Sequence, residues 1–308
     1  MIVVFGSINV DLVCRVPAIA RPGETVLARG YETLHGGKGA NQAVAAARAG
    51  GGLPVLMCGR VGEDGFGDAA RANLASEGID VAGVLAGPDP TGCAFIAVDP
   101  SGENAITVAS GANAALRAGD LTHAFAAGDV LVLQMEVPFG EALAVARRAR
   151  DGGARVVWNF APASVELDRA ACLSLLDAAD VLVVNEHEAR AAAALIGPAD
   201  ENAEGAATAL SVGRTDVVLT RGALGAMLAR AGSIAAEARA ATVRVVDTTG
   251  AGDTFVGVLA SCMAEGRDLA DGLARSCIAA SLACRNAGAQ AGMPSRIELD
   301  RTQHRGTG

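Results

Sequence analysis

Short apolar runs alternate along this chain with stretches that are rich in alanine. The apolar runs predict strands at Ile2–Phe5, 54–57, Val130–Leu133, 155–158, 181–184 and 217–220. A helical pattern occupies residues 41–49, and each of the last four runs is followed by another. Apolar strands separated by helices are typical of a parallel sheet that is covered on both faces. We therefore predict an α/β fold with a doubly wound, mostly parallel central sheet.

Two intervals, approximately residues 10–35 and 91–110, interrupt this alternation. Both have strand–turn–strand patterns without an intervening helix, and residues 99–102 supply the turn of the second interval. Such patterns belong to small antiparallel sheets, so we predict an antiparallel lid inserted into a single α/β domain of residues 1–308. A pair of separate surface hairpins is the alternative.

Composition excludes several classes of protein. The chain has 25 Lys and Arg against 34 Asp and Glu, a net charge of -9, so a nucleic-acid-binding or anionic-membrane surface is not expected. No apolar stretch approaches the roughly 18 residues that span a bilayer, and the first residues lack a basic signal region. Seven scattered cysteines and four distant histidines indicate a protein of the reducing cytoplasm without disulfides or a zinc site.

The strongest candidate for chemistry is the segment Asp-Thr-Thr-Gly-Ala-Gly-Asp that ends at Asp253. It lies between a predicted strand at 242–246 and a predicted helix at 255–264. Small residues at such a turn let the N–H groups of Gly250, Ala251 and Gly252 face an anion at a helix N-terminus. A carboxylate beside an anion hole is suited to accept a proton from an attacking hydroxyl, which predicts a general base at Asp253. The alternative is an ordinary N-cap aspartate after a glycine turn.

A second glycine-rich segment, Gly36-Gly37-Lys38-Gly39-Ala40-Asn41, also opens a predicted helix. Of the 25 basic residues, Lys38 is the one lysine and the other 24 are arginines. The segment is not a Walker A loop, because Lys38 is followed by glycine. The first strand is not followed by Gly-x-Gly-x-x-Gly either, which disfavours a dinucleotide-dependent oxidoreductase. Close backbone approach to a ligand, with the charge of Lys38 and the amide of Asn41, is the expected use.

Polar residues also follow other predicted strands. Asn9 and Asp11 are two apart and project to one side of an extended chain, which suits a polyhydroxylated ligand, although an Asx-turn would explain one of them. Asn185 and Glu188 follow the strand at 181–184 and could hold hydrated Mg²⁺ against phosphates, with a helix capping box as the alternative. Glycines follow Thr220 and permit a turn close to a nucleotide.

Together these motifs resemble the ribokinase family of ATP-dependent sugar kinases, also called the PfkB family, from Gly6 to about Pro294. The matching stretches occur in the family's order: Gly-Ser-Ile-Asn-x-Asp from Gly6, Pro-Gly-Glu-Thr-Val from Pro22, Gly-Gly-Lys-Gly-Ala-Asn-Gln-Ala-Val from Gly36, Gly-Ala-Asn-Ala-Ala-Leu from Gly111 and Asn-x-Ala-Pro-Ala from Asn159. The resemblance implies a Rossmann-like α/β domain with a small β-sheet lid. It also implies transfer of the γ-phosphate of ATP to the 5-hydroxyl of D-ribose.

The resemblance implies roles for individual residues. It makes Asp253 the general base and Gly250, Ala251 and Gly252 the anion hole. The sugar site would comprise Asn9, Asp11, Gly37, Lys38, Asn41, Glu136 and Asp253. The nucleotide site would comprise Asn185, Thr220, Gly222, Gly225 and Gly252. Glu188 would arrange Mg²⁺ through water, and K⁺ or another monovalent cation would be held by Asp247, Thr249 and the backbone at Ala283, Asn286 and Gly288.

The sequence departs from the family's pattern at three places. Gly292 stands where members often have a serine near the cation. The expected adenine pocket along residues 277–283 lacks a polar residue to select the base. Residues 50–52 are three glycines and add two residues before the next strand, which we interpret as a longer loop.

We therefore expect a cytoplasmic sugar kinase, with ATP and a sugar as its small-molecule partners and no nucleic-acid or membrane partner. A kinase of the same family for another sugar or a nucleoside is one alternative, and a catalytically silent sugar-binding regulatory protein is another. The presence of Asp253, the anion hole and the Asn185–Glu188 pair favours an enzyme. The free edges of the lid sheet predict a homodimer through lid–lid contact.

Overall fold

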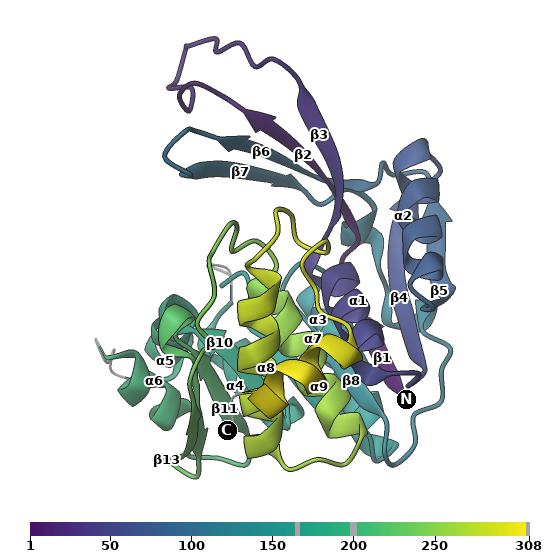
Figure 1. Ribbon diagram of the computed structural model, residues 1–308. Coiled ribbons are helices and arrows are strands. Elements are labelled where there is room, and N and C mark those ends of the chain that lie inside the picture. Colours follow the sequence, from purple (N-terminus) through teal and green to yellow (C-terminus); the bar gives the residue numbers. More distant parts are fainter. Residues whose placement is uncertain (164–166, 198–201, 306–308) are drawn as a thin grey trace.

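The protein is described by a computed structural model that covers residues 1–163, 167–197 and 202–305 (Figure 1). Its larger part is built on one central sheet, and a smaller sheet projects from it, at the top of Figure 1.

The central sheet has nine strands in the order β13-β12-β11-β10-β9-β8-β1-β4-β5. Neighbouring strands are parallel except at one edge, where the pairs β11–β12 and β12–β13 are antiparallel. The strands are β1 (Ile2–Phe5), β4 (Val55–Gly62), β5 (Asp80–Gly87), β8 (Val130–Leu133), β9 (Arg155–Asn159), β10 (Val181–Asn185), β11 (Asp216–Thr220), β12 (Ala226–Arg230) and β13 (Ser233–Ala238). The predicted mostly parallel sheet is confirmed, and β5, β12 and β13 are strands that were not predicted from the sequence.

Helices cover both faces of the sheet, as predicted. Ile2 and Val4 of β1 pack into one apolar cluster and Val3 and Phe5 into another, because successive strand residues point to opposite faces. The first face carries α1 (Lys38–Gly50), α2 (Gly65–Ser76), α7 (Ala251–Ala264) and α8 (Leu269–Ala283), and the second carries α3 (Phe139–Asp151), α4 (Arg169–Ala178), α5 (Glu186–Ile196) and α6 (Ala203–Leu210). The last helix, α9 (Arg296–Arg305), packs on the outside of the first layer.

The smaller sheet, which we call the lid, has the strand order β3-β2-β6-β7. Its strands are β2 (Asn9–Arg15), β3 (Tyr31–Gly36), β6 (Gly92–Val98) and β7 (Asn104–Ala109), so both predicted intervals contribute to it. The prediction that this sheet is antiparallel throughout is wrong, because β2 and β6 pair in parallel. The reason is that β2 follows β1 and β6 follows β5, two parallel strands of the central sheet, and both leave the same edge in the same direction.

Two other local predictions are wrong. Residues 242–246 form no strand, since β12 and β13 occupy that edge of the sheet and the N–H groups of Val246 and Asp247 donate instead to the carbonyl oxygen of Cys284 at 2.8 and 3.2 Å. No helix follows β11 directly. A single 3₁₀ turn, Gly222–Leu224, leads into β12.

Among the described residues, none of the helices has the length and apolar character needed to cross a bilayer.

Candidate active site

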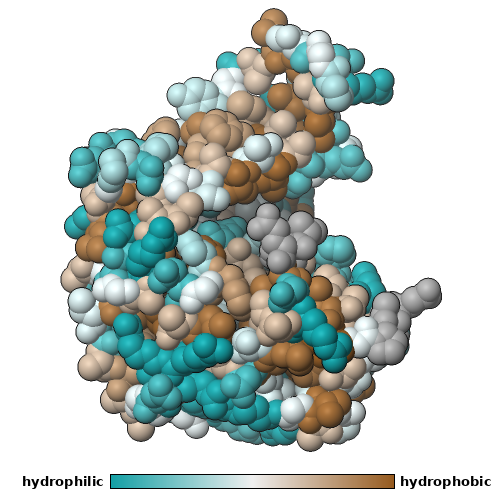
Figure 2. Space-filling view, turned by 180° about the vertical axis from the view of Figure 1, so that it is seen from behind, coloured by the Kyte–Doolittle hydropathy of each residue, from teal (hydrophilic) through white to brown (hydrophobic). Residues whose placement is uncertain are grey.

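The polar segments predicted to bear function meet at the carboxyl edge of the central sheet, beneath the lid. The segment that holds Asn9 follows β1, the segment that holds Glu136 follows β8, and Asn185 ends β10. Ligands of doubly wound sheets bind at this edge because loops from many strands converge there. Figure 2 shows the molecule hollowed between the lid and the larger part, with apolar lid side chains above the hollow.

Asp253 lies in the first turn of α7 and is 7% exposed. The N-cap of α7 is Gly250, in the left-handed region with φ 74°, and a Cβ there would lie 2.6 Å from the carbonyl oxygen of Ala289. The interpretation of Asp253 as an N-cap is therefore excluded. The N–H groups of Gly252 and Asp253 have no partner within the helix, so this helix end can face an anion.

Two amide side chains of α1 hold the carboxylate of Asp253. Asn41 Nδ2 donates to Oδ2 at 2.9 Å, and Gln42 Nε2 donates to Oδ1 at 3.0 Å. These contacts require α1 and α7 to cross closely, and Gly257 permits it, since a Cβ at that position would lie 2.4 Å from the carbonyl oxygen of Gln42. The base and its two donors are thus placed by the packing of two helices.

The glycines around Lys38 serve packing first. Gly37 has φ 87°, and a Cβ there would lie 2.6 Å from the backbone nitrogen of Asn9. The expectation that these glycines admit a ligand is therefore corrected in part, because Gly37 and Gly39 fit against the segment after β1. The charge of Asp253 is the largest influence that raises the pKa of Lys38, and it outweighs the opposing effect of burial.

Asn9, Asp11 and Glu136 form the sugar end of the predicted site. Asn113 Nδ2 donates to Asn9 Oδ1 at 2.7 Å, and Ser7 Oγ donates to Glu136 Oε2 at 2.6 Å. Burial raises the pKa of Asp11 to about 6, assisted by the negative charges of Glu136 and Asp253 and opposed by Lys38. The three predicted side chains are thus brought together, although Asn9 and Asp11 lie on β2 and Glu136 lies in the segment after β8.

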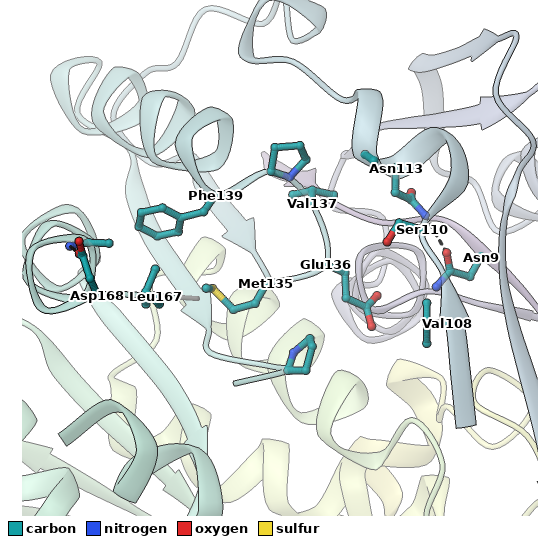
Figure 3. Close-up of a pocket in the computed structure, with 14 residues that line it drawn as sticks. Asn9, Val108, Ser110, Asn113, Met135, Glu136, Val137, Phe139, Leu167 and Asp168 are labelled. Atoms are coloured by element: carbon teal, nitrogen blue, oxygen red, sulfur yellow. Dashed lines mark hydrogen bonds between the residues drawn. The ribbon is translucent and has the colours of Figure 1, made fainter. Parts of the chain in front are cut away.

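A cavity of about 600 Å³ begins at this sugar end (Figure 3). Asn9, Ser110 and Glu136 line one side. Met135, Phe139 and Leu167 lie farther along, so this part of the cavity is mainly apolar, although Asp168 also lines it.

Asn185 and Glu188 do form a capping box at the start of α5. Glu188 Oε2 accepts from the backbone nitrogen of Asn185 at 2.9 Å, and Asn185 Oδ1 accepts from that of Glu188 at 2.8 Å. Glu188 is nevertheless 7% exposed, and burial raises its pKa, while the N–H of Asn185 and the charge of Lys38 oppose that rise. One carboxylate at the edge of the site fits a hydrated Mg²⁺ that is held through water.

The predicted nucleotide-binding residues lie at the end of β11 and in the turn that follows it. Thr220 ends β11 and pairs in register with Asn185 of β10. Gly222 and Gly225 have φ of 52° and 94°, which permits the tight turn that follows. Arg221, which precedes Gly222, pairs with Glu204 and Glu237 at 2.6 and 3.1 Å and anchors the turn.

The residues expected to hold a monovalent cation gather in the loop beside α7. Asp247 Oδ1 accepts from the N–H and hydroxyl of Thr249 at 2.9 and 2.7 Å, and Oδ2 accepts from the N–H of Gly288 at 2.8 Å. Burial alone would raise the pKa of Asp247, but these donors together lower it. A charged carboxylate beside backbone carbonyls fits a K⁺ ion. A Cβ at Gly292 would lie 2.1 Å from the carbonyl oxygen of Ala283, so a serine would not fit here without a shift.

Several buried polar residues of the site were missed in the sequence. They are Ser7, Gln42, Asn113, Gln134, Asn159 and Gln290. Gln42 directly follows Asn41 in a recognised motif, and Gln134 is the first polar residue after β8, so both had a local signal. Gln290 lies in a loop far along the chain and had none.

With this geometry established, comparison with known proteins identifies relatives over the whole chain. Residues 1–296 match the pfkB family carbohydrate kinases. The ribokinase of Haemophilus influenzae is 36% identical over 303 residues, 96% of this chain and 95% of that protein.

Solved structures agree. The crystal structure of ribokinase from Thermotoga maritima has a TM-score of 0.89 at 30% identity and covers 99% of both chains. The structure of Arabidopsis thaliana ribokinase complexed with ribose and ATP has a TM-score of 0.83 at 29% identity and covers 97% of both chains. The predicted resemblance is confirmed, and the chain belongs to the PfkB family of carbohydrate kinases.

Proposed function

We propose that this kinase transfers the γ-phosphate of ATP to the 5-hydroxyl of D-ribose and forms ribose 5-phosphate. The observation that supports this most directly is the placement of a buried carboxylate, Asp253, at a helix N-terminus within the electrostatic reach of Asp11 and Lys38. A polyhydroxylated acceptor and a transferring phosphoryl group need these two environments side by side.

In the proposed reaction, Asn9 and Asp11 orient the sugar, and Asp253 accepts the proton of its 5-hydroxyl. That oxygen forms a bond to the γ-phosphorus as the bond from phosphorus to the leaving oxygen of ADP breaks. The N–H groups at the start of α7 face the charge that develops on the phosphoryl oxygens: those of Gly252 and Asp253 have no partner within the helix, whereas that of Ala251 donates to the carbonyl oxygen of Thr248 at 3.2 Å. Lys38 adds a positive charge on the same side.

We assign the expected cations to residues that fit them. Glu188 would hold Mg²⁺ through water beside the phosphates, where the ion would neutralise charge on ATP. Asp247, Thr249 and the backbone at Ala283, Asn286 and Gly288 would hold K⁺ next to the anion hole.

The test is a panel of acceptors with ATP: ribose, deoxyribose, fructose, 2-keto-3-deoxygluconate and adenosine. The proposal predicts the highest kcat/KM with ribose, and a phosphate on its 5-oxygen in the product. A higher kcat/KM with another acceptor would overturn the assignment of ribose. Absence of acceptor-dependent ATP consumption across the whole panel would favour a silent binding protein.

The apolar end of the cavity favours a second candidate function. Met135, Phe139 and Leu167 offer no hydrogen-bond partner for a pentose, but they suit a ring attached to the sugar. A nucleoside acceptor would fill this end, and the adenosine arm of the panel distinguishes it from free ribose.

We also propose that the protein is a homodimer that forms through the lid. Exposed apolar side chains gather there: Leu27, Tyr31, Phe95, Ile106 and Val108 are each at least 48% exposed. Strands β3 and β7 leave free edges on either side. By strand register Tyr31 and Phe95 lie on the face opposite to Ile106 and Val108, and a second copy of the lid would cover the face of Ile106 and Val108 together with the edges. Seven free cysteines support the expected cytoplasmic location.

A further inference from the structure

The carboxylate of Asp253 is the inner end of two chains of buried amide groups. In the first chain, Gln134 Nε2 donates to Gln42 Oε1 at 2.8 Å, and Gln42 Nε2 donates to Asp253 Oδ1 at 3.0 Å. In the second chain, Gln290 Nε2 donates to Asn41 Oδ1 at 2.9 Å, and Asn41 Nδ2 donates to Asp253 Oδ2 at 2.9 Å. Each carboxylate oxygen therefore receives one N–H from a residue that is itself held by another amide.

All four amides are buried. Gln42 and Gln134 are 0% and 1% exposed, and Asn41 and Gln290 are 5% and 8% exposed. Buried amides are costly unless they make hydrogen bonds, and four of them around one carboxylate exceed what packing requires. Gln134 Oε1 has no hydrogen-bond partner among the residues that the structure describes, although the nitrogen of the same amide is used.

The direction of the two chains follows from chemistry. An ionised carboxylate only accepts hydrogen bonds, so Asn41 and Gln42 must turn their N–H groups toward Asp253. Their carbonyl oxygens then face outward and need donors, and Gln290 and Gln134 supply them. Asn73 Nδ2 continues the second chain with a bond to Gln290 Oε1 at 2.9 Å.

Without these outer donors, the amides of Asn41 and Gln42 are freer to rotate by half a turn about their terminal bonds, although Gln42 Nε2 also donates to Asn159 Oδ1 at 3.1 Å, a bond that opposes its rotation. A rotated amide would present a carbonyl oxygen to Asp253, and a carboxyl group meets a carbonyl oxygen favourably only when it is protonated. A protonated Asp253 cannot accept the proton of the sugar.

We propose that Gln134 and Gln290 are positioning residues for the catalytic base, which fix the orientation of the amides of Gln42 and Asn41 and thereby hold Asp253 ready to accept a proton. The inference rests on the proposed function, since it assumes that Asp253 is the base. Neither glutamine needs to touch the sugar or ATP for this role.

The test uses Gln134→Leu and Gln290→Leu, which remove the outer donors without adding charge. We expect kcat to fall about tenfold for each variant, which is less than the rate contribution of a positioned base itself. KM for ribose and for ATP should change less than about threefold. Gln303→Leu is the control, because it removes a glutamine that bonds to Arg275 outside these chains, and kcat should not change.

A pH profile separates a positioning role from a merely structural one. The charges that act on Asp253 and its surroundings are Lys38 of α1, Asp11 of β2, Glu188 of α5 and Glu136 after β8, and none is altered in the leucine variants. We therefore expect the acidic limb of the kcat/KM profile to move to higher pH in both variants and to stay in place in Gln303→Leu. An unmoved limb with lower kcat would overturn the proposal.

A double-mutant cycle with Asp253→Asn distinguishes failure of this inference from failure of the proposed function. If Gln134 acts through Asp253, then Gln134→Leu should change kcat little in the Asp253→Asn background. An undiminished tenfold effect there would overturn the inference and leave the base intact. Near-normal turnover of Asp253→Asn alone would instead overturn the role of Asp253 as the base in the proposed function, and the inference with it.

Discussion

Two charged residues of opposite sign, Lys38 and Asp11, show how single side chains shape this site. Asp253 is the largest influence on the pKa of Lys38, and Asp11 has a pKa of about 6. Both residues are proposed to bind the ligand, and the charged form of Asp11 costs stability, because burial favours its protonated form.

Lys38 is the one lysine of a chain that otherwise uses arginine, and the replacement Lys38→Arg should lower kcat/KM by on the order of tenfold or more. A compact ammonium fits between two glycines that pack against the segment after β1, whereas the planar guanidinium is broader and its geometry differs. Steady-state kinetics with ribose and ATP would check this. Unchanged kcat/KM would mean that the single lysine is a coincidence of composition.

Asp11→Asn should stabilise the fold at pH 8 and weaken ribose binding. A carboxyl group whose pKa is raised on folding favours the folded state below its unfolded pKa, and this contribution is lost as the pH rises through the folded value, here about 6. The gain at pH 8 should be up to about 3 kcal/mol, since one pKa unit corresponds to about 1.4 kcal/mol. Urea unfolding at pH 8 and pH 4 measures it. An equal effect at both pH values would contradict the argument.

Among the helices, α1, α5 and α7 all point their N-terminal turns toward the site. At the start of α5, Asn185 and Glu188 have both a capping role and a proposed role in the site. The capping box of Asn185 and Glu188 explains both side chains structurally, yet Glu188 is buried, and burial raises its pKa against the opposing charge of Lys38. Capping and ion binding require different properties of the same side chain, so a substitution can separate them.

Glu188→Gln is that substitution. Glutamine can still accept the N–H of Asn185, so the free energy of unfolding should change by less than about 1 kcal/mol. The lost charge should lower kcat/KM about tenfold or more and raise the Mg²⁺ concentration needed for half-maximal rate. Normal kinetics at low Mg²⁺ would leave the capping box as the whole explanation.

Some strands and site residues of this protein could be predicted from its sequence. Strands β1, β8, β10 and β11 were predicted because each contains an unbroken apolar run, and Asp253 because its motif is local. Strand β5 was missed since alanine and glycine dilute its pattern, and residues 242–246 were misread since Val245 and Val246 are exposed, at 58% and 59%. The role of Gln290 depends on a contact 249 residues along the chain, which periodicity cannot reveal.

At the scale of the whole molecule, the lid joins the active site to a surface that suits another copy. Strand register places Val13, Ile96 and Ile106 in one row, on the same face as Asp11, Ala94 and Val108. The apolar face of the lid therefore continues from the sugar site to the proposed dimer contact.

Ile106→Asp should shift the protein from dimer to monomer, because it places a charge in the middle of this apolar face. Sedimentation velocity at micromolar concentration checks the outcome. Val212→Asp is a matched control, since Val212 is 71% exposed but belongs to the larger part of the molecule, and it should not alter the mass. A monomeric unmodified protein would contradict the proposed dimer.

The role of Asp253 as the base of a ribose kinase is tested most directly by ribose-dependent ADP formation. The rate is measured for the unmodified protein and for Asp253→Asn. Asparagine keeps the size of the side chain but cannot take the proton. We predict that turnover falls on the order of 100-fold or more, with ribose still bound. Turnover within a few-fold of the unmodified protein, with ribose bound equally well, would contradict the account.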